Sequence, residues 1–274
     1  MRLLRLLRGI PKGVLLIILL AWVITPVYFL LATSFTKQGV YLHGFQLPPI
    51  FSLENYQLIF AGQSSIWLPL INSTIVTVAT TVLALALAAP AAWALSHYRN
   101  GRWGRFLYLS FYVLRGIPPV ALVLPFYIIF SRLHLLNSIV GIIIGLTPLA
   151  LPYCVWMLRV TFDSIPAEVE EAASVDGAGL WRTFVQVVLP IAAPSIAAAG
   201  ILSALFTYVD FMVVTTLAGP ATETFPLYVT TFQQDFVSLV GPIAAASIIG
   251  MIPMLLLFGF SQRFMKRLAT AGIH

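Results

Sequence analysis

Long apolar runs separated by short polar segments dominate the sequence. Six of these runs have about the 20 residues that a helix needs to cross the hydrocarbon core of a bilayer. We place them at about 14–34, 69–95, 106–130, 139–160, 192–217 and 242–262. Because only helices and closed barrels satisfy their backbone hydrogen bonds inside a membrane, runs of this length predict helices. The pattern therefore predicts an all-α polytopic membrane protein, with six transmembrane helices in a single domain over residues 1–274.

The composition supports this prediction. Of the 274 residues, 9% are charged and 60% are hydrophobic, which is typical of polytopic membrane proteins. Basic residues exceed acidic ones, but they lie at the ends of apolar runs and not in a stripe with interleaved aromatics, so nucleic-acid binding is not indicated. The single cysteine, Cys154, excludes an intrachain disulfide framework, and the four scattered histidines predict no metal site.

The distribution of Lys and Arg predicts the orientation. Twelve of the fifteen lie before the first run, in the second and fourth loops or after the last run, whereas Lys37 and Arg132 lie on the other side. Both termini, and the loop over residues 161–190, are therefore expected to be cytoplasmic. The basic start followed by an apolar run also resembles a signal peptide. That run is long and no A-x-A site closes it, so we favour an uncleaved first span.

The loop over residues 161–190 is far more polar than the runs around it. Its residues 168–176 contain four of the chain's nine acidic residues, Glu168, Glu170, Glu171 and Asp176. A membrane protein that holds such a loop between two spans is expected to present it to a soluble partner.

Local signals predict two short helices in this loop. Ser164 is expected to cap the first, with Pro166 in its opening turn, where a missing N–H costs nothing. Gly177 suits a left-handed end to that helix. A second amphipathic segment, over residues 180–189, is expected to run along the membrane surface until Pro190 and a second proline four residues later redirect the chain into the fifth span.

The spacing within the loop is specific. Glu171-Ala172-Ala173 is followed after three residues by Gly177, and after nine more by Val187-x-Leu189-Pro190. This pattern resembles the EAA loop of the permease subunits of ABC importers, with Val187 at a position that is often Ile. Six positions agree over twenty residues, so chance agreement is improbable.

The resemblance implies a fold, partners and residue roles. In that family the helix with the EAA motif sits in a cleft of the ATPase subunit and transmits its closure. The resemblance therefore implies the type I importer permease fold, a sister permease forming a heterodimer, two ATPase subunits and an extracytoplasmic binding protein, in the plasma membrane of a bacterium or archaeon. The residues to which it gives a role in ATPase coupling are Glu168, Glu171, Ala172, Ala173, Asp176, Gly177, Leu189 and Pro190.

Weaker matches, in the same order along roughly residues 20–265, extend the resemblance to permeases that import sugars, in particular the smaller permease of maltose-type importers. The matching stretches are FSLENY at 51–56, Asn72-Ser73, Ala94-Leu95, Gly101-Arg102, the P-x5-PFY run from Pro119 to Tyr127, and Leu133 to Asn137. The expected solute is a sugar or a related polyol.

The sequence has no Walker A motif. That motif requires G-x4-G-K-[ST], and the three lysines stand in Pro-Lys-Gly, Thr-Lys-Gln and Met-Lys-Arg. We therefore expect a non-catalytic subunit that binds no cofactor itself, with ATP and Mg²⁺ held by a partner ATPase.

Ionisable residues within membrane spans are expensive and are functional candidates by default. Two qualify: Arg115 in the third run and Asp210 in the outer half of the fifth. Sugar permeases often have Trp and Asn where Tyr208 and Val209 precede Asp210. Each charge is expected either to face the solute path or to form a structural pair. Tyr127 and Tyr208 are further candidates for the path, although packing is the simpler role for both.

Two other functions remain open at this point. A self-sufficient secondary transporter is disfavoured, since such proteins usually have more spans arranged as repeats with broken helices. A membrane enzyme would need clustered catalytic residues at one interface, and none is visible. An ABC importer permease for a solute other than a sugar also fits the EAA pattern.

Overall fold

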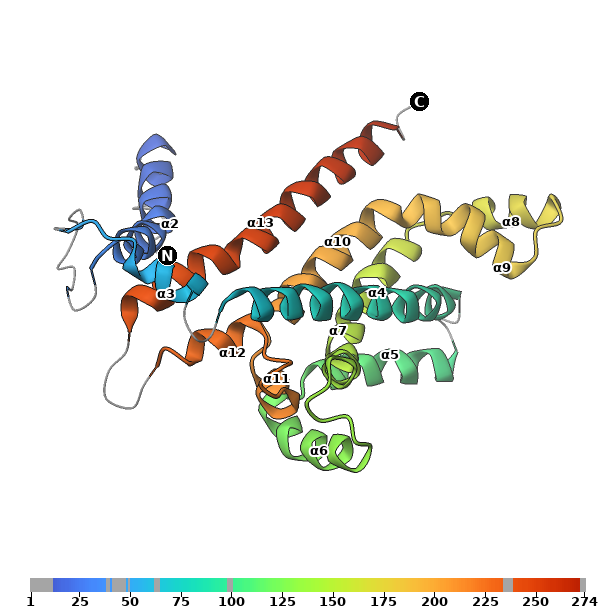
Figure 1. Ribbon diagram of the computed structural model, residues 1–274. Helices are drawn as coiled ribbons and strands as arrows, with labels where there is room; N and C mark the ends of the chain where they lie inside the picture. Colours follow the sequence, from blue (N-terminus) through green and yellow to red (C-terminus); the bar gives the residue numbers. More distant parts are fainter. Residues whose placement is uncertain are drawn as a thin grey trace, which may run out of the picture. The chain divides into compact units, whose positions relative to one another are not determined.

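The computed structural model describes residues 12–37, 40, 48, 50–61, 65–97, 101–233 and 239–271. These residues are largely helical, with one isolated antiparallel bridge between Thr36 and Phe51. Figure 1 shows the helices in chain order. They are α2 (Lys12–Ser34), α3 (Glu54–Ala61), α4 (Trp67–His97), α5 (Arg102–Arg115), α6 (Pro119–Arg132), α7 (Ile139–Phe162), α8 (Ala167–Val175), α9 (Leu180–Thr183), the π-helix η1 (Phe184–Val188), α10 (Leu189–Tyr208), α11 (Met212–Leu217), α12 (Phe225–Thr230) and α13 (Val240–Ala271).

The chain forms two compact units. Unit 1 comprises Met1–Ile66 and Val229–Met251, and unit 2 comprises Trp67–Tyr228 and Ile252–His274. The described part of unit 1 contains α2, α3 and the first part of α13. Unit 2 contains α4 to α11 and carries the residues to which the sequence assigns a function.

The all-α membrane fold is confirmed, and three of the predicted spans agree closely with α2, α4 and α7. Among the described residues, five helical segments are long and apolar enough to cross a membrane: Gly13–Ser34, Trp67–His97, Ile139–Phe162, Leu180–Tyr208 and Val240–Gly259. Many large apolar side chains on these helices are exposed, as expected of surfaces that face lipid.

The third predicted span, 106–130, is not one continuous helix. It is divided into α5 and α6, because Gly116 caps the end of α5 and Pro118 is the N-cap of α6. Two consecutive prolines, Pro118 and Pro119, lack the N–H groups that would continue α5, and a proline disfavours helical backbone in the residue before it. Hydropathy alone gives no sign of this break.

The fifth predicted span, 192–217, is also wrong at both ends. The helical segment begins at Leu180 and ends at Tyr208. Residues 209–211 then interrupt it, before the short helix α11 begins. Asp210 therefore lies in the break between two helices and not inside a span.

In the described part of unit 2, two apolar clusters hold the helices together. The first joins α4, α7, η1 and α10 and is rich in small side chains, among them Ala84, Ala88 and Ala92, all fully buried. The second joins α4, α6, the first half of α7, and α11. Small side chains allow membrane helices to approach closely, which replaces the hydrophobic driving force that lipid does not supply.

Gly145 of α7 shows how close this approach is. A Cβ at Gly145 would lie 2.6 Å from Cδ1 of Leu217 and 3.2 Å from Cγ1 of Val213, both on α11. A side chain at position 145 would therefore require Leu217 and Val213 to shift, because α11 packs closely on α7 at this point.

In unit 1, the FSLENY stretch (residues 51–56) forms hydrogen bonds with the C-terminal end of α2 and the residues that follow it. The side-chain amide of Asn55 donates to the carbonyl oxygens of Ser34 (3.0 Å) and Thr36 (2.8 Å), and the hydroxyl of Tyr56 donates to Oγ of Ser34 (2.9 Å). Phe35 stacks on Phe51 with ring centroids 4.8 Å apart. These contacts give the stretch a structural role in this chain.

Candidate functional site

The predicted coupling loop is a short helix, α8, closed by a glycine turn. Gly177 has φ +77°, and its N–H bonds to the Ser174 carbonyl (3.0 Å), while the N–H of Ala178 bonds to the Ala173 carbonyl (2.9 Å). These two bonds form a Schellman motif, which requires a left-handed residue at the position of Gly177. The prediction of a left-handed end at Gly177 is confirmed.

The start of α8 differs from the prediction. Pro166 is itself the N-cap, with no side-chain cap, and the hydroxyl of Ser164 donates instead to the Thr161 carbonyl at the end of α7 (2.6 Å). Ser164 thus closes α7 and does not open α8. A serine hydroxyl bonds readily to a nearby carbonyl of its own chain, and that alternative prevails here.

The second half of the loop does not run as a separate segment up to Pro190. From Leu180 the chain stays helical through α9, η1 and α10 to Tyr208. Pro190 occupies the first turn of α10, immediately after the π-helix η1. The wider π turn interrupts the regular ladder at the point where a proline ring would otherwise clash with the preceding turn. The predicted redirection of the chain at Pro190 is therefore wrong.

One face of the loop is open. Glu168, Glu171, Ala172 and Asp176 are all exposed, and Gly177 and Pro190 are exposed as well, whereas Leu189 is half-buried and Ala173 is buried. Three large apolar side chains stand on the same loop and are highly exposed: Val175 (87%), Leu180 (78%) and Trp181 (71%). A polar and apolar surface of this kind, at the tip of a loop, is typical of a protein-binding site.

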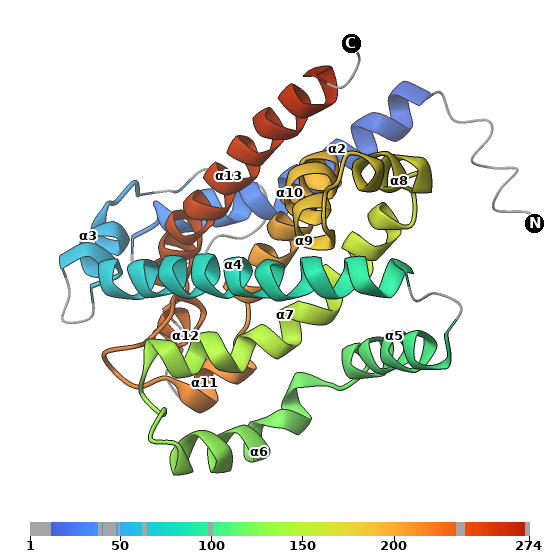
Figure 2. The same ribbon diagram turned by 90° about the vertical axis from the view of Figure 1, so that its right-hand side faces the viewer.

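The opposite face of α8 contacts α4. The indole N–H of Trp93 donates to Oε1 of Glu170 (3.2 Å), and Nε2 of His97 lies 2.8 Å from Oε2 of the same carboxylate. Trp93 also stacks on Phe184 of η1, with ring centroids 4.9 Å apart. Sequence reasoning missed these contacts, because 77 residues separate Trp93 from Glu170 and no local pattern links them. In both Figure 1 and Figure 2, α8 lies near the end of α4.

At the other end of unit 2, Asp210 lines a small cavity. One carboxylate oxygen accepts a hydrogen bond from the backbone N–H of Val213 (2.9 Å) in the first turn of α11. The cavity has a volume of about 110 Å³, and Tyr153, Phe206 and Thr207 also line it. The rings of Tyr153 and Phe206 stack with centroids 4.7 Å apart. Asp210 thus has both a structural bond and access to a space between α7 and α10.

The other path candidates lie apart from this cavity. Tyr127 is exposed on α6, and Tyr208 is buried and stacks on Phe225 with ring centroids 6.0 Å apart. Arg115 is the last residue of α5, and its side chain lies outside the described residues. Among the residues that the structure describes, no group of three His, Cys, Asp or Glu side chains is placed to hold a metal ion.

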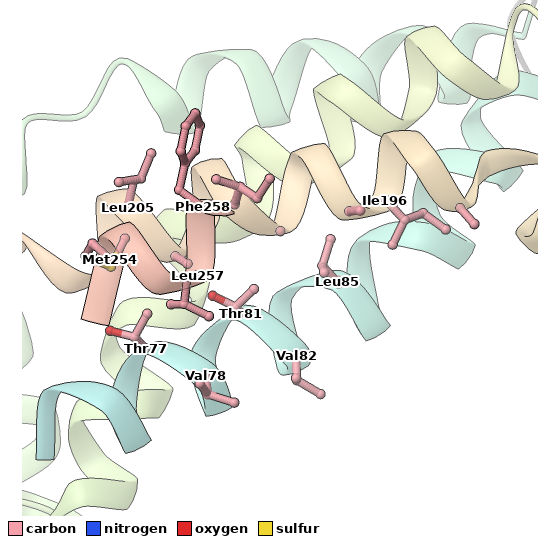
Figure 3. Close-up of a pocket in the computed structure, with 15 residues that line it drawn as sticks. Thr77, Val78, Thr81, Val82, Leu85, Ile196, Leu205, Met254, Leu257 and Phe258 are labelled. Carbon is pink, nitrogen blue, oxygen red and sulfur yellow. The ribbon is translucent and has the colours of Figure 1, made fainter. Parts of the chain in front are cut away.

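A larger cavity of about 470 Å³ lies between α4, α10 and the second part of α13. Figure 3 shows that apolar side chains line it, including Val82, Leu205 and Phe258, with the hydroxyls of Thr77 and Thr81 on its α4 side. Sugars need several polar partners, so this lining suits lipid chains or an apolar helix better than a sugar.

The segment between α11 and α12 is tied to the start of α4. The side-chain amide of Asn72 donates to the carbonyl oxygens of Ala221 (3.1 Å) and Glu223 (2.9 Å), and Oγ of Ser73 accepts from the N–H of Phe225 (2.7 Å). Burial raises the pKa of the Glu223 carboxyl. The Asn72-Ser73 pair quoted for the sugar permeases therefore orders this segment.

Comparison with known families identifies the chain. Residues 84–270 match the family described as binding-protein-dependent transport system inner membrane component. The chain belongs to this family. The matched residues include the whole loop with α8 and its contacts to α4. This membership makes the chain a permease subunit of a binding-protein-dependent ABC importer, a multi-pass protein of the inner membrane and a non-catalytic component. It also excludes the self-sufficient secondary transporter.

Several permeases of this family resemble the chain over most of its length. The trehalose transport system permease protein SugB of Mycobacterium tuberculosis is 30% identical, over 93% of both chains. The sulfoquinovosyl glycerol transport system permease protein SmoH of Agrobacterium fabrum is 31% identical, over 81% of this chain and 78% of SmoH. A bacterial ABC transporter for the import of the acidic polysaccharide alginate has the same fold, with a TM-score of 0.77, 23% identity, and coverage of 94% and 96%.

Proposed function

We propose that this permease carries a sugar or related polyol across the membrane as one half of a heterodimer with a sister permease. The permease pair works with two ATPase subunits, which bind ATP and Mg²⁺. One of them docks on the loop around α8, and an extracytoplasmic binding protein delivers the solute. Both termini and α8 then face the cytoplasm. The observation that carries the proposal is the exposed face of α8, with the EAA residues in a defined helix. The sugar specificity is supported by the named solutes of SugB and SmoH.

We expect the chain alone to give no ATP-dependent uptake in liposomes. Its energy source is a separate subunit, because the sequence contains no Walker A lysine. Co-expression with its ATPase and its sister permease should give ATP-dependent uptake of the solute that its binding protein holds. Uptake by the purified chain alone would contradict the proposal. A solute that is not a sugar or polyol, found by thermal-shift screening of the binding protein, would contradict the specificity.

We further propose that Asp210 contacts the solute in its path. A carboxylate accepts hydrogen bonds from sugar hydroxyls, and the rings of Tyr153 and Phe206 beside it offer an apolar face. Asp210→Asn keeps an oxygen that accepts from the N–H of Val213, so α11 retains its first-turn bond and only the charge is lost. We expect solute transport by the assembled complex to fall several-fold.

The matched control for Asp210 is Glu223→Gln. Glu223 is a second partly buried carboxylate of unit 2, outside the cavity. Initial uptake rates, normalised to the amount of assembled complex, provide the measurement. Equal transport by the wild-type and Asp210→Asn complexes would show that Asp210 serves α11 alone.

A further inference from the structure

We propose that Glu170 is a positioning residue, which joins α8 to the end of α4 so that a force on the exposed face of α8 acts directly on α4. This inference rests on the proposed docking of an ATPase at that face. It assigns a role to a carboxylate outside the EAA residues and to two side chains, Trp93 and His97, on a different helix.

The geometry divides α8 into an outer and an inner face. Successive residues of an α-helix point about 100° apart, so Glu171 points outward while Glu170 points toward α4. Ala173, three residues after Glu170, shares its face, and it is the one buried residue of α8. The inner face therefore consists mainly of two apolar side chains, Ala173 and the half-buried Val169, and one carboxylate.

Such a helix needs a directional contact to hold its position. Isolated helices shorter than about 12–15 residues are marginal in water, and α8 has nine residues. The apolar contact of α8 is small, because Ala173 and Val169 are the two apolar side chains of this helix that are not exposed. The two hydrogen bonds to Glu170 are charge-assisted, and such bonds are stronger than neutral ones. They fix both the place of α8 and its rotation about its own axis.

Trp93 connects three elements at this point. Its indole N–H bonds to α8, its ring stacks on Phe184 of η1, and it lies edge-on to His97 with ring centroids 5.0 Å apart. Nδ1 of His97 lies 3.0 Å from the Trp93 carbonyl oxygen, which orients the imidazole toward Glu170. Displacement of α8 is therefore transmitted to the last turn of α4 and, through Phe184, to the π-helix at the start of the next span.

The test uses the complete transporter in proteoliposomes and measures ATP hydrolysed per solute imported. We expect Glu170→Ala to lower transport about 10-fold while ATP hydrolysis changes less than 2-fold, so that the ratio rises at least 5-fold. Glu170→Gln, which keeps an acceptor for Trp93, should restore part of the transport. Combining Glu170→Ala with His97→Ala should add little, because both changes remove the same contact. An unchanged ratio in Glu170→Ala, or fully additive effects, would overturn the inference.

The control is Asp163→Asn. Asp163 forms an ion pair of 3.5 Å with Arg159 within the same turn at the end of α7, so it tests charge loss near the loop without a contact between helices. Absence of ATP-dependent uptake by the wild-type complex would instead refute the proposed function.

If Glu170→Ala fails to assemble, a crosslink answers the same question. His97→Cys and Glu170→Cys, introduced together with Cys154→Ala and joined by a short bifunctional reagent, hold α8 and α4 together. The inference requires at least half of the transport to remain, since the two helices move as one. Loss of transport on crosslinking would overturn it.

Discussion

Gly177→Val should lower ATP-driven transport about 5- to 30-fold while membrane insertion stays normal. At φ +77° an L-residue costs roughly 1–2 kcal/mol, and a β-branched one is especially unfavourable. That energy corresponds to the stated factor in the population of the correct loop conformation. Because the Schellman turn sets the direction in which the chain leaves α8, we expect its loss to displace the exposed face on which we propose that the ATPase docks.

The chain offers a matched control two residues away. Gly179 has an extended backbone, φ −72° and ψ 165°, and a Cβ at either glycine would meet no atom within 4 Å. Gly179→Val therefore adds the same bulk without strain and should transport nearly normally, and Gly177→Asn, which tolerates left-handed backbone, should lie in between. Uptake rates per assembled complex measure the difference. Equal rates for the two valine variants would show that the turn is not needed for coupling.

Glu171→Lys should weaken binding of the ATPase subunit about 30-fold or more. Glu171 is exposed on the outer face of α8, and loss of one partner of a buried interfacial charge pair costs about 2 kcal/mol or more. Reversal of the charge adds repulsion to that loss. Titration of the solubilised permease pair with ATPase subunits measures the affinity, and Glu171→Gln should have a smaller effect.

Glu54→Lys is the control for Glu171→Lys. It tests whether the loss of ATPase affinity comes from a lost contact or only from placing a lysine on an exposed helix. Glu54 is an exposed glutamate in the first turn of α3, where charge reversal costs the helix about 0.3–1 kcal/mol. Glu171 lies beyond the first turn of α8, so the control costs its own helix at least as much. Glu54 lies far along the chain from the coupling loop, and its reversal should leave ATPase affinity unchanged. The docking role of Glu171 would be refuted by an affinity equal to that of the Glu54→Lys complex.

Features encoded by neighbouring residues were predictable from the sequence. The spans at α2, α4 and α7 follow from hydropathy, and the left-handed Gly177 follows from one glycine after a helical pattern. The divided third span carried a signal in Pro118-Pro119, but a hydropathy window averages over backbone breaks. At Pro190 the sequence predicts a helix boundary, and the structure has none. The π turn before Pro190 accommodates the proline, so the helix continues through it.

The contacts of the coupling loop with α4 could not have been predicted in this way. Trp93, His97 and Glu170 meet only after α4, α7 and α8 have packed, and each has an ordinary sequence context. Glu170 stands beside Glu171, and composition gives no reason to separate an inward carboxylate from an outward one. The helical rotation of α8 decides between them, and tertiary packing sets that rotation.

The helices at the two ends of unit 2 differ in length. At the α8 end, the long helices α4, α7 and α10 run unbroken into the apolar cluster that meets the loop. At the other end, α6 and α11 are short and separate, and they pack on each other and on α7 beside Gly145. We therefore expect a rotation that begins at the α8 end to be carried along α4, α7 and α10, and the backbone breaks around Pro118 and Asp210 to absorb it at the other end.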